Sequence, residues 1–342
     1  MSGWRFATLI LFALAACAEE PLYTAEGHAF GVPVKVAVYG ENKARAAERA
    51  AEVLAQFGRL EGEVEPWKGG LLSRVNSAFA SGETVSAPRL APLIERATWV
   101  SVYTDGLLNP AGGRLARLWG FDTSESTSAF PDHDQVAQVL AALPRMSDVQ
   151  YVGGWASSSN RGVWLDFSGF IQGYALDRGA EYLRMQGIKN ALITVGNNAV
   201  ALGSRGERAW RATIPHPREK GSIAAVALKD GEALASSGDY QRYFEVAGRR
   251  YCPILDPRTG FPAQGIQAAS VLAPAVPHAG VRADAAAKAL FVSGIVHWRE
   301  AAAKMDLELA MLIDEYGKLH VTPALMNRLT LSGKDILVHV SP

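Results

Sequence analysis

The chain has little cysteine and no excess of charge of either sign. Only two cysteines, Cys17 and Cys252, occur in its 342 residues, so a disulfide framework is excluded as the source of its stability. Its 34 basic residues balance 34 acidic ones, which gives no electrostatic reason to expect nucleic acid as a partner. It also lacks internal repeats and low-complexity segments. Its hydrophobic share of 49% is that of a globular protein with a large core.

Long hydrophobic runs are also missing. The apolar stretch of residues 6–16 is too short to span a bilayer as a stable helix. It follows Arg5 and ends in Leu-Ala-Ala-Cys at Cys17, which looks like a bacterial lipobox. We therefore predict a lipoprotein signal peptide over residues 1–16, a lipid on Cys17 and a tether over residues 17–26. The alternative is an ordinary secretory signal followed by a chance cysteine.

Under the lipoprotein prediction, the protein is extracytoplasmic, on the periplasmic side of a bacterial membrane, and held there by its N-terminal lipid. Cys252 is then unpaired and no intrachain disulfide is expected. We interpret Cys252 as a small, half-buried strand residue rather than a reactive thiol.

The rest of the chain mixes helices and strands in an irregular order. Helical spacing predicts helices over residues 43–60, 88–104, 134–143, 172–185 and 283–292. Ser86 is the expected N-cap of the second helix. Strand signals fall at residues 34–39, 163–167, 191–195, 210–214, 224–228, 233–236, 242–246, 250–254, 308–313 and 318–321. This order indicates an α+β protein with one domain over residues 27–342 and a helical lobe near residues 41–145.

Two motifs point to chemistry. Asp166 to Asp177 places Gly169 where a strand passes into a helix, so that the backbone can approach a ligand and the helix start can offer N–H groups to a phosphate. An ordinary strand–helix connection is the alternative. Asp284 and Lys288 lie one helical turn apart and share a face. This spacing is typical of a surface ion pair, and it would also suit a ligand-binding site.

Together with the turn of residues 256–262, these blocks resemble the signature blocks of the ApbE family, the FAD:protein FMN transferases. The resemblance runs in order from about residue 27 to 323. It implies an ApbE-like fold, with antiparallel and mixed sheets, a helical lobe, and FAD between them. The implied reaction cleaves the FAD pyrophosphate and attaches FMN through a phosphoester to a Thr or Ser of an extracytoplasmic flavoprotein. Mg²⁺ is the implied metal.

The resemblance also implies roles for individual residues. The predicted FAD contacts are Phe30, Trp67, Leu107, Leu108, Asn109, Asp166, Gln172, Asn197 and Ile254. The family positions for metal ligands fall on the Gly169 carbonyl and Asp284, and the predicted catalytic pair is Asp284 with Lys288.

Four positions depart from the family pattern. Gln172 replaces a lysine and Asn109 an aspartate. Pro253 replaces a histidine beside the reacting phosphate, and proline has no group that titrates. Lys288 replaces a threonine that ligates Mg²⁺. An ammonium group cannot ligate a metal, but it can neutralise phosphate charge.

Two hypotheses follow from these departures. One is an FMN transferase in which Lys288 acts as a fixed cation. The other is a non-catalytic FAD-binding lipoprotein, acting as a flavin carrier or as a maturation partner of a redox complex.

Overall fold

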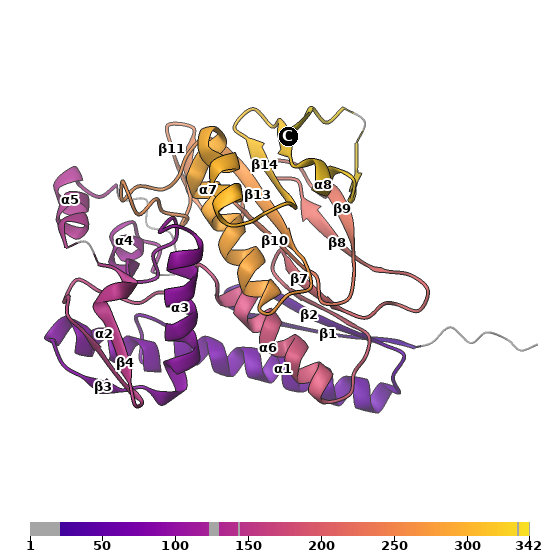
Figure 1. Cartoon of the computed structure of the whole chain (residues 1–342), viewed down its shortest axis with the longest axis horizontal. Helices are drawn as coiled ribbons and strands as arrows, with labels where there is room; N and C mark the ends of the chain where they lie inside the picture. Colours follow the sequence, from indigo (N-terminus) through magenta and orange to yellow (C-terminus); the bar gives the residue numbers. More distant parts are fainter. Residues whose placement is uncertain (1–20, 123–129, 143, 334, 342) are drawn as a thin grey trace, which may run out of the picture.

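The computed structural model describes residues 21–122, 130–142, 144–333 and 335–341. Figure 1 shows two lobes side by side, a helical lobe on the left and a large twisted sheet on the right. In the described ranges, no helix has both the length and the apolar character needed to cross a bilayer.

The sheet lobe is built on nine strands in the order β1-β2-β6-β7-β10-β13-β14-β15-β17. Neighbouring strands run antiparallel, except for the parallel pair β15 and β17 at one edge. The nine strands are β1 (Leu22–Ala29), β2 (Val32–Tyr39), β6 (Ala191–Val195), β7 (Asn198–Leu202), β10 (Ala233–Gly238), β13 (Ile266–Ala273), β14 (Ala310–Asp314), β15 (Leu319–Val321) and β17 (Val338–Val340).

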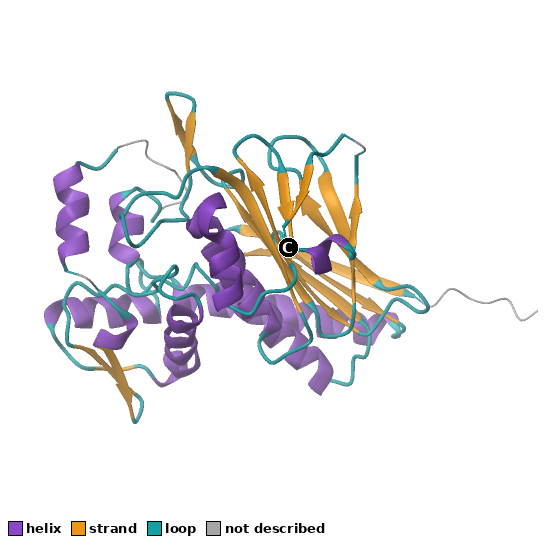
Figure 2. Cartoon of the chain, turned by 45° about the horizontal axis from the view of Figure 1, so that its top comes forward, coloured by secondary structure: helices purple, strands orange, loops and turns teal. Residues whose placement is uncertain are grey.

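Both faces of this sheet are covered, as Figure 2 shows. Helices α1 (Lys43–Val64), α6 (Ile171–Met185) and α7 (Ala279–Lys304) pack on one face. A second sheet of β8 (Trp210–Pro215), β9 (Ser222–Leu228) and β16 (Leu329–Leu331) packs on the other. The period-2 pattern of β2 explains the layering: Val34, Val36 and Val38 face the helices, whereas Ala37 faces the second sheet.

The helical lobe has its own apolar core. Its elements are α2 (Leu71–Ser81), η1 (Pro88–Leu90), α3 (Ala91–Tyr103), α4 (Gly113–Leu118), α5 (His133–Ala141), η2 (Met146–Asp148) and the small sheet of β3 (Val85–Ser86), β4 (Val149–Val152) and β5 (Trp155–Ser158). Helix α1 joins the lobes, because its middle contributes Val53 and Phe57 to the sheet-lobe core and its last residue, Val64, belongs to the helical-lobe core.

The remaining elements are the hairpin of β11 (Phe244–Val246) and β12 (Arg249–Tyr251), and the one-turn helix α8 (Pro323–Met326). The hairpin turn at Ala247 and Gly248 has positive φ at both residues, 50° and 76°, as the predicted two-residue turn requires. Cys252 follows β12. It is fully buried in the sheet-lobe core rather than half-buried in a strand, and burial raises the pKa of its thiol to about 12.

The α+β prediction is confirmed, but several boundaries differ. Residues 163–167 do not form a regular strand. They run beside the loop that precedes α4 and make only an isolated bridge between Trp164 and Gly112. Ser86 lies in β3 and does not cap a helix, because a 3₁₀ turn starting at Pro88 precedes α3. Residues 22–26, predicted as part of a tether, form the first part of β1.

Candidate active site

A cavity of about 1450 Å³ lies between the lobes. Its walls come from the β1–β2 turn, the helical lobe, the segment before α6, the end of β10 and the loop after β12. Many of the residues predicted from sequence line it: Phe30, Trp67, Leu108, Asn109, Asp166, Gly169, Gln172, Pro253, Ile254 and Lys288. The motif blocks, far apart in the sequence, therefore converge on one cavity large enough for a ligand of cofactor size.

Three predicted residues do not line the cavity. Leu107 packs against the sheet-lobe core. The Asn197 amide donates a hydrogen bond to Tyr240 Oη at 3.0 Å. Asp284 is fully buried beneath Lys288. The functional roles of these three residues remain predictions.

The Asp284 carboxylate is already engaged at both oxygens. One accepts a hydrogen bond from the backbone N–H of Gly173 at 2.9 Å, and the other forms an ion pair with the Lys288 ammonium. The Lys288 side chain is only 17% exposed and reaches the cavity. Its cation is therefore fixed in the wall, and one of the first-turn amides of α6 is not available to a ligand.

The crossing of α6 and α7 sets this geometry. A Cβ atom on Gly173 would lie 2.2 Å from the Gly280 carbonyl oxygen, so the two helices meet at a contact that only glycine allows. Each helix also caps the other. Asp284 of α7 accepts from Gly173 of α6, while Asp177 of α6 accepts from the N–H groups of Gly280 and Val281 of α7, at 2.8 and 3.0 Å.

The implied Mg²⁺ does not fit the residue at its family position. Mg²⁺ is usually held by one or two carboxylates together with water and phosphate oxygens, so the state of the Asp284 carboxylate decides the fit. Asp284 supplies a carboxylate that already carries an ammonium partner. A divalent cation on that carboxylate would be repelled by the Lys288 charge by about 4 kcal/mol for each unit of its own charge at a separation of ~4 Å.

The segment before α6 contributes Asp166 to the cavity wall, and the position of Asp166 depends on a buried asparagine. Asn76 donates to the Leu165 carbonyl at 2.9 Å and accepts from the Leu165 N–H at 2.6 Å. These bonds hold the extended segment that the sequence suggested was a strand. Asp166 accepts from the Ser168 N–H at 2.8 Å, and burial raises the pKa of its carboxyl.

Gln172 connects the start of α6 to the sheet. Its side-chain oxygen accepts a hydrogen bond from the Asn198 amide at 3.1 Å, and Asn198 in turn accepts from the N–H of Ser236 at 3.1 Å. The amide that replaces the family lysine is thus part of a polar network between α6, β7 and β10.

An aromatic column stands at the helical-lobe wall. Trp67 stacks on Trp164, with ring centroids 4.7 Å apart and planes 14° from parallel. The guanidinium group of Arg117 lies 5.0 Å from the Trp67 ring centre, and that of Arg114 lies 5.5 Å from the Trp164 ring centre. Trp67 is therefore held rigidly at the cavity, already partnered by a ring and a cation.

The loop after β12 contributes Pro253, Ile254 and a tight turn to the wall. Within the turn, Arg258 forms a bidentate pair with Asp256, with Nε and Nη2 distances of 2.9 and 2.7 Å. Arg258 and Arg242 both line the cavity, although sequence reasoning did not assign them to the site. Arg258 lies inside the quoted turn of residues 256–262, so a basic residue within that block was the signal that could have found it, whereas Arg242 lies outside the quoted blocks.

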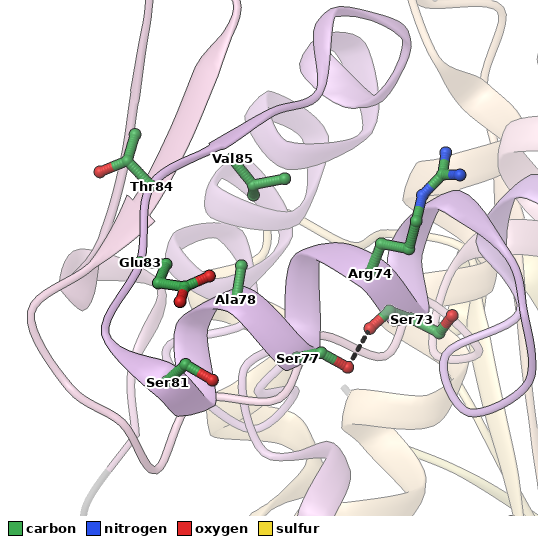
Figure 3. Close-up of a pocket in the computed structure, with 8 residues that line it drawn as sticks. All are labelled: Ser73, Arg74, Ser77, Ala78, Ser81, Glu83, Thr84 and Val85. Carbon is green, nitrogen blue, oxygen red and sulfur yellow. Dashed lines mark hydrogen bonds between the residues drawn. The ribbon is translucent and has the colours of Figure 1, made fainter.

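A second hollow of about 340 Å³ on α2 shares no lining residue with the large cavity. Figure 3 shows its serines along one side of the helix. Ser73 and Ser77 donate their hydroxyl hydrogens to the Gly70 and Ser73 carbonyls, both at 2.9 Å. Because both hydroxyls already donate to nearby backbone carbonyls, we interpret the hollow as part of the ordinary surface of α2.

Comparison with known proteins identifies a family for this chain. The ApbE family model matches residues 30–313. The chain is 35% identical over 321 residues to the FAD:protein FMN transferase of Rhodobacter capsulatus, covering 94% of this chain and 60% of that protein. It is 26% identical over 322 residues to the FAD:protein FMN transferase of Salmonella typhimurium, covering 89% of this chain and 90% of that protein.

Two solved structures have the same fold. The crystal structure of the ApbE protein from Thermotoga maritima matches with a TM-score of 0.81 at 27% identity, covering 90% of this chain and 99% of that chain. The apo form of the Pseudomonas stutzeri flavinyl transferase ApbE matches with a TM-score of 0.78 at 24% identity, covering 90% and 97%.

The molecule is thus an α+β protein with a ligand cavity between two lobes. The chain belongs to the ApbE family, which confirms the resemblance of its motif blocks. It spans 60% of the length of the Rhodobacter capsulatus relative.

Proposed function

We propose that this chain is an FAD:protein FMN transferase. The observation that supports this most directly is the convergence of the flavin motif blocks on one large cavity within an ApbE fold. The relatives that match most of the chain carry the same activity in their names.

In the proposed reaction, a hydroxyl oxygen of the acceptor attacks the phosphorus atom on the FMN side of the FAD pyrophosphate. A new P–O bond forms to the acceptor, and the bridging P–O bond breaks, with its electron pair leaving on AMP. The hydroxyl proton passes to a base or to water. Lys288 and Arg258 supply positive charge at the cavity wall, where phosphate charge would lie. We propose no step through Mg²⁺, because the residues present do not fit it.

Among its described residues, the cavity lacks an evident group to accept the proton of the attacking hydroxyl. Pro253 occupies the family histidine position, and no histidine lines the cavity in the described part of the chain. This observation favours a second candidate function, a non-catalytic FAD-binding protein that carries flavin or assists the maturation of a redox complex.

Location and partner complete the proposal. The lipobox-like sequence ending at Cys17 supports a lipid-anchored protein on the periplasmic side of a bacterial membrane. Cys17 lies outside the described residues. The acceptor is proposed to be an extracytoplasmic flavoprotein or a subunit of a redox complex, modified at a Thr or Ser.

One measurement distinguishes the two candidate functions. The mature protein is incubated with FAD and a folded acceptor bearing the flavinylation motif, and the acceptor mass is then determined. An increase equal to one FMN phosphoester, together with release of AMP, supports the transferase. FAD binding without a mass change favours the carrier. No FAD binding at any concentration below about 1 mM contradicts both.

A further inference from the structure

Building on the proposed function, we infer that the Asp284–Lys288 ion pair takes the place of a divalent cation, so that this chain binds the pyrophosphate of FAD without Mg²⁺. The ion pair would stabilise the phosphate charge of bound FAD whether or not FMN transfer to an acceptor is fast.

The Asp284 carboxylate, which lies behind this wall, already has a partner at each of its two oxygens. Asp284 is 0% exposed. Its two oxygens are held by the Gly173 N–H and by the Lys288 ammonium. A buried carboxylate with both oxygens partnered has no need of a metal to compensate its charge.

The Lys288 cation is fixed in position and faces the cavity. Lys288 lines the cavity, whereas Asp284 lies behind it. The close contact of Gly173 and Gly280 fixes α7 against α6, so the ammonium is positioned by two packed helices rather than by a mobile loop. Such a preorganised cation can meet a phosphate without assembling a metal site.

A second cation, Arg258 from the turn after β12, contacts α7. Arg258 Nη2 lies 3.3 Å from the Val292 carbonyl oxygen, one turn of α7 beyond Lys288. Arg258 also lines the cavity. Lys288 and Arg258 therefore both present positive charge to the cavity, although Asp284 and Asp256 each offset part of that charge.

The primary test needs no variant. FAD binding to the full wild-type chain is measured by calorimetry in MgCl₂ and, after removal of divalent ions, in EDTA. We expect the two dissociation constants to agree within about twofold. A loss of affinity of about tenfold or more in EDTA, restored by Mg²⁺, overturns the inference. It leaves the proposed function intact, because FAD still binds. Absence of FAD binding under both conditions instead contradicts the proposed function.

Two variants of Lys288 sharpen the test. Lys288→Thr frees an oxygen of Asp284 and adds a hydroxyl one turn along the same face, so FAD binding should become Mg²⁺-dependent by about tenfold or more. Lys288→Met removes the cation without adding an oxygen ligand, so affinity should fall in both buffers. The matched control is Lys35→Thr, which breaks an exposed ion pair with Glu26 between two residues that do not line the cavity, and this variant should bind FAD like the wild type.

Metal binding can also be measured directly. Mn²⁺ replaces Mg²⁺, and its electron paramagnetic resonance spectrum reports whether it is free or bound. In the presence of FAD, Mn²⁺ should remain free with the wild type and become bound with Lys288→Thr. Stoichiometric Mn²⁺ binding by the wild-type FAD complex overturns the inference even if both variants fold poorly.

Discussion

At the scale of single residues, Pro253 limits proton transfer in the cavity. It lines the wall next to Ile254 and has neither a titratable group nor an N–H. Of the carboxyl groups that line the cavity, Asp166 is held by its burial at a pKa above the ordinary value. It comes from the segment before α6, whereas Pro253 comes from the loop after β12.

We predict that Pro253→His raises the rate of FMN transfer by about 100-fold, because a histidine at neutral pH can accept the hydroxyl proton. The measurement is the rate of acceptor flavinylation, followed by in-gel flavin fluorescence. Pro253→Ala is the control for the loss of the proline ring and should leave the rate unchanged. If the wild type already transfers FMN rapidly and Pro253→His does not alter the rate, this chain moves the proton with another group.

A second residue-scale prediction concerns Asp177. The pKa of Asp177 is raised to about 6, mainly by burial and to a small extent by the charge of Asp284, whereas the hydrogen bonds from the Val281 and Gly280 N–H groups and the charge of Arg96 lower it. Since the folded-state pKa lies above the ordinary 3.8, this group's contribution to stability is complete below about pH 4 and is lost as pH rises to about 6.

The expected decline is at most about 3 kcal/mol. Asp177→Asn should remove it, because the amide does not titrate. Urea midpoints of the wild type and the variant, compared between pH 4 and pH 7, check the prediction. Parallel curves would contradict it.

At the scale of elements, the crossing of α6 and α7 holds the site together. The two helices contact through Gly173 and Gly280, and each presents an aspartate to the first turn of the other. The same crossing buries Asp284 and points Lys288 into the cavity. A change in helix separation would therefore alter stability and the position of the cation together.

We predict that Gly280→Ala lowers the free energy of unfolding by about 2 kcal/mol or more. Its Cβ would lie 2.4 Å from the Gly173 carbonyl oxygen and 2.8 Å from an Asp177 carboxylate oxygen. The matched control is Gly62→Ala in α1, where nothing lies within 4 Å of the new methyl group. That change should raise stability by roughly 0.5–1 kcal/mol. Urea unfolding measures both, and equal effects would refute the packing explanation.

At the scale of the whole molecule, the cavity and the first residue of β1 lie at opposite ends of that strand. Phe30 follows the last residue of β1 and lines the cavity, whereas Leu22 begins the strand. Eight residues of strand span about 27 Å. Figure 1 places the start of β1 at the end of the sheet away from the helical lobe. A lipid at Cys17 would thus hold the protein to a membrane with its cavity directed away from the anchor.

The corresponding prediction is that Cys17→Ser releases the protein from the membrane fraction and abolishes incorporation of labelled palmitate. Only a few residues separate Cys17 from Leu22, so the domain should lie within about 20 Å of the lipid. Cys252→Ser is the control and should leave membrane association unchanged. Retention of Cys17→Ser in the membrane fraction would indicate an anchor other than the lipid.

Much of this architecture could be predicted because its elements carry clear periodicities. The valines of β2 and the stripe of α3 are examples. β13 could not be predicted, since all eight of its residues are buried and a strand covered on both faces shows no alternation. Helix α1 extends to Val64 despite Gly58 and Gly62, because packing against both lobes outweighs the low helix propensity of glycine.

The motif blocks predicted many of the residues that line the cavity, but they did not predict the hydrogen-bond and stacking partners of those residues. The saturation of Asp284 depends on a backbone N–H of another helix, and that contact exists only because two glycines distant in sequence meet. The stacking of Trp67 on Trp164 likewise depends on how the segment of residues 163–167 folds back, which Asn76 determines through Leu165. Such contacts are tertiary, and no local pattern encodes them.

The burial of Cys252 also makes the folded protein kinetically resistant to thiol reagents. With its pKa raised to about 12, only about one thiol in 10⁵ is ionised at neutral pH, and none of the side chain is exposed. An alkylating reagent therefore modifies Cys252 only in molecules whose core has opened. In a Cys17→Ser background, the rate of labelling would therefore report the rate at which the core around Cys252 opens.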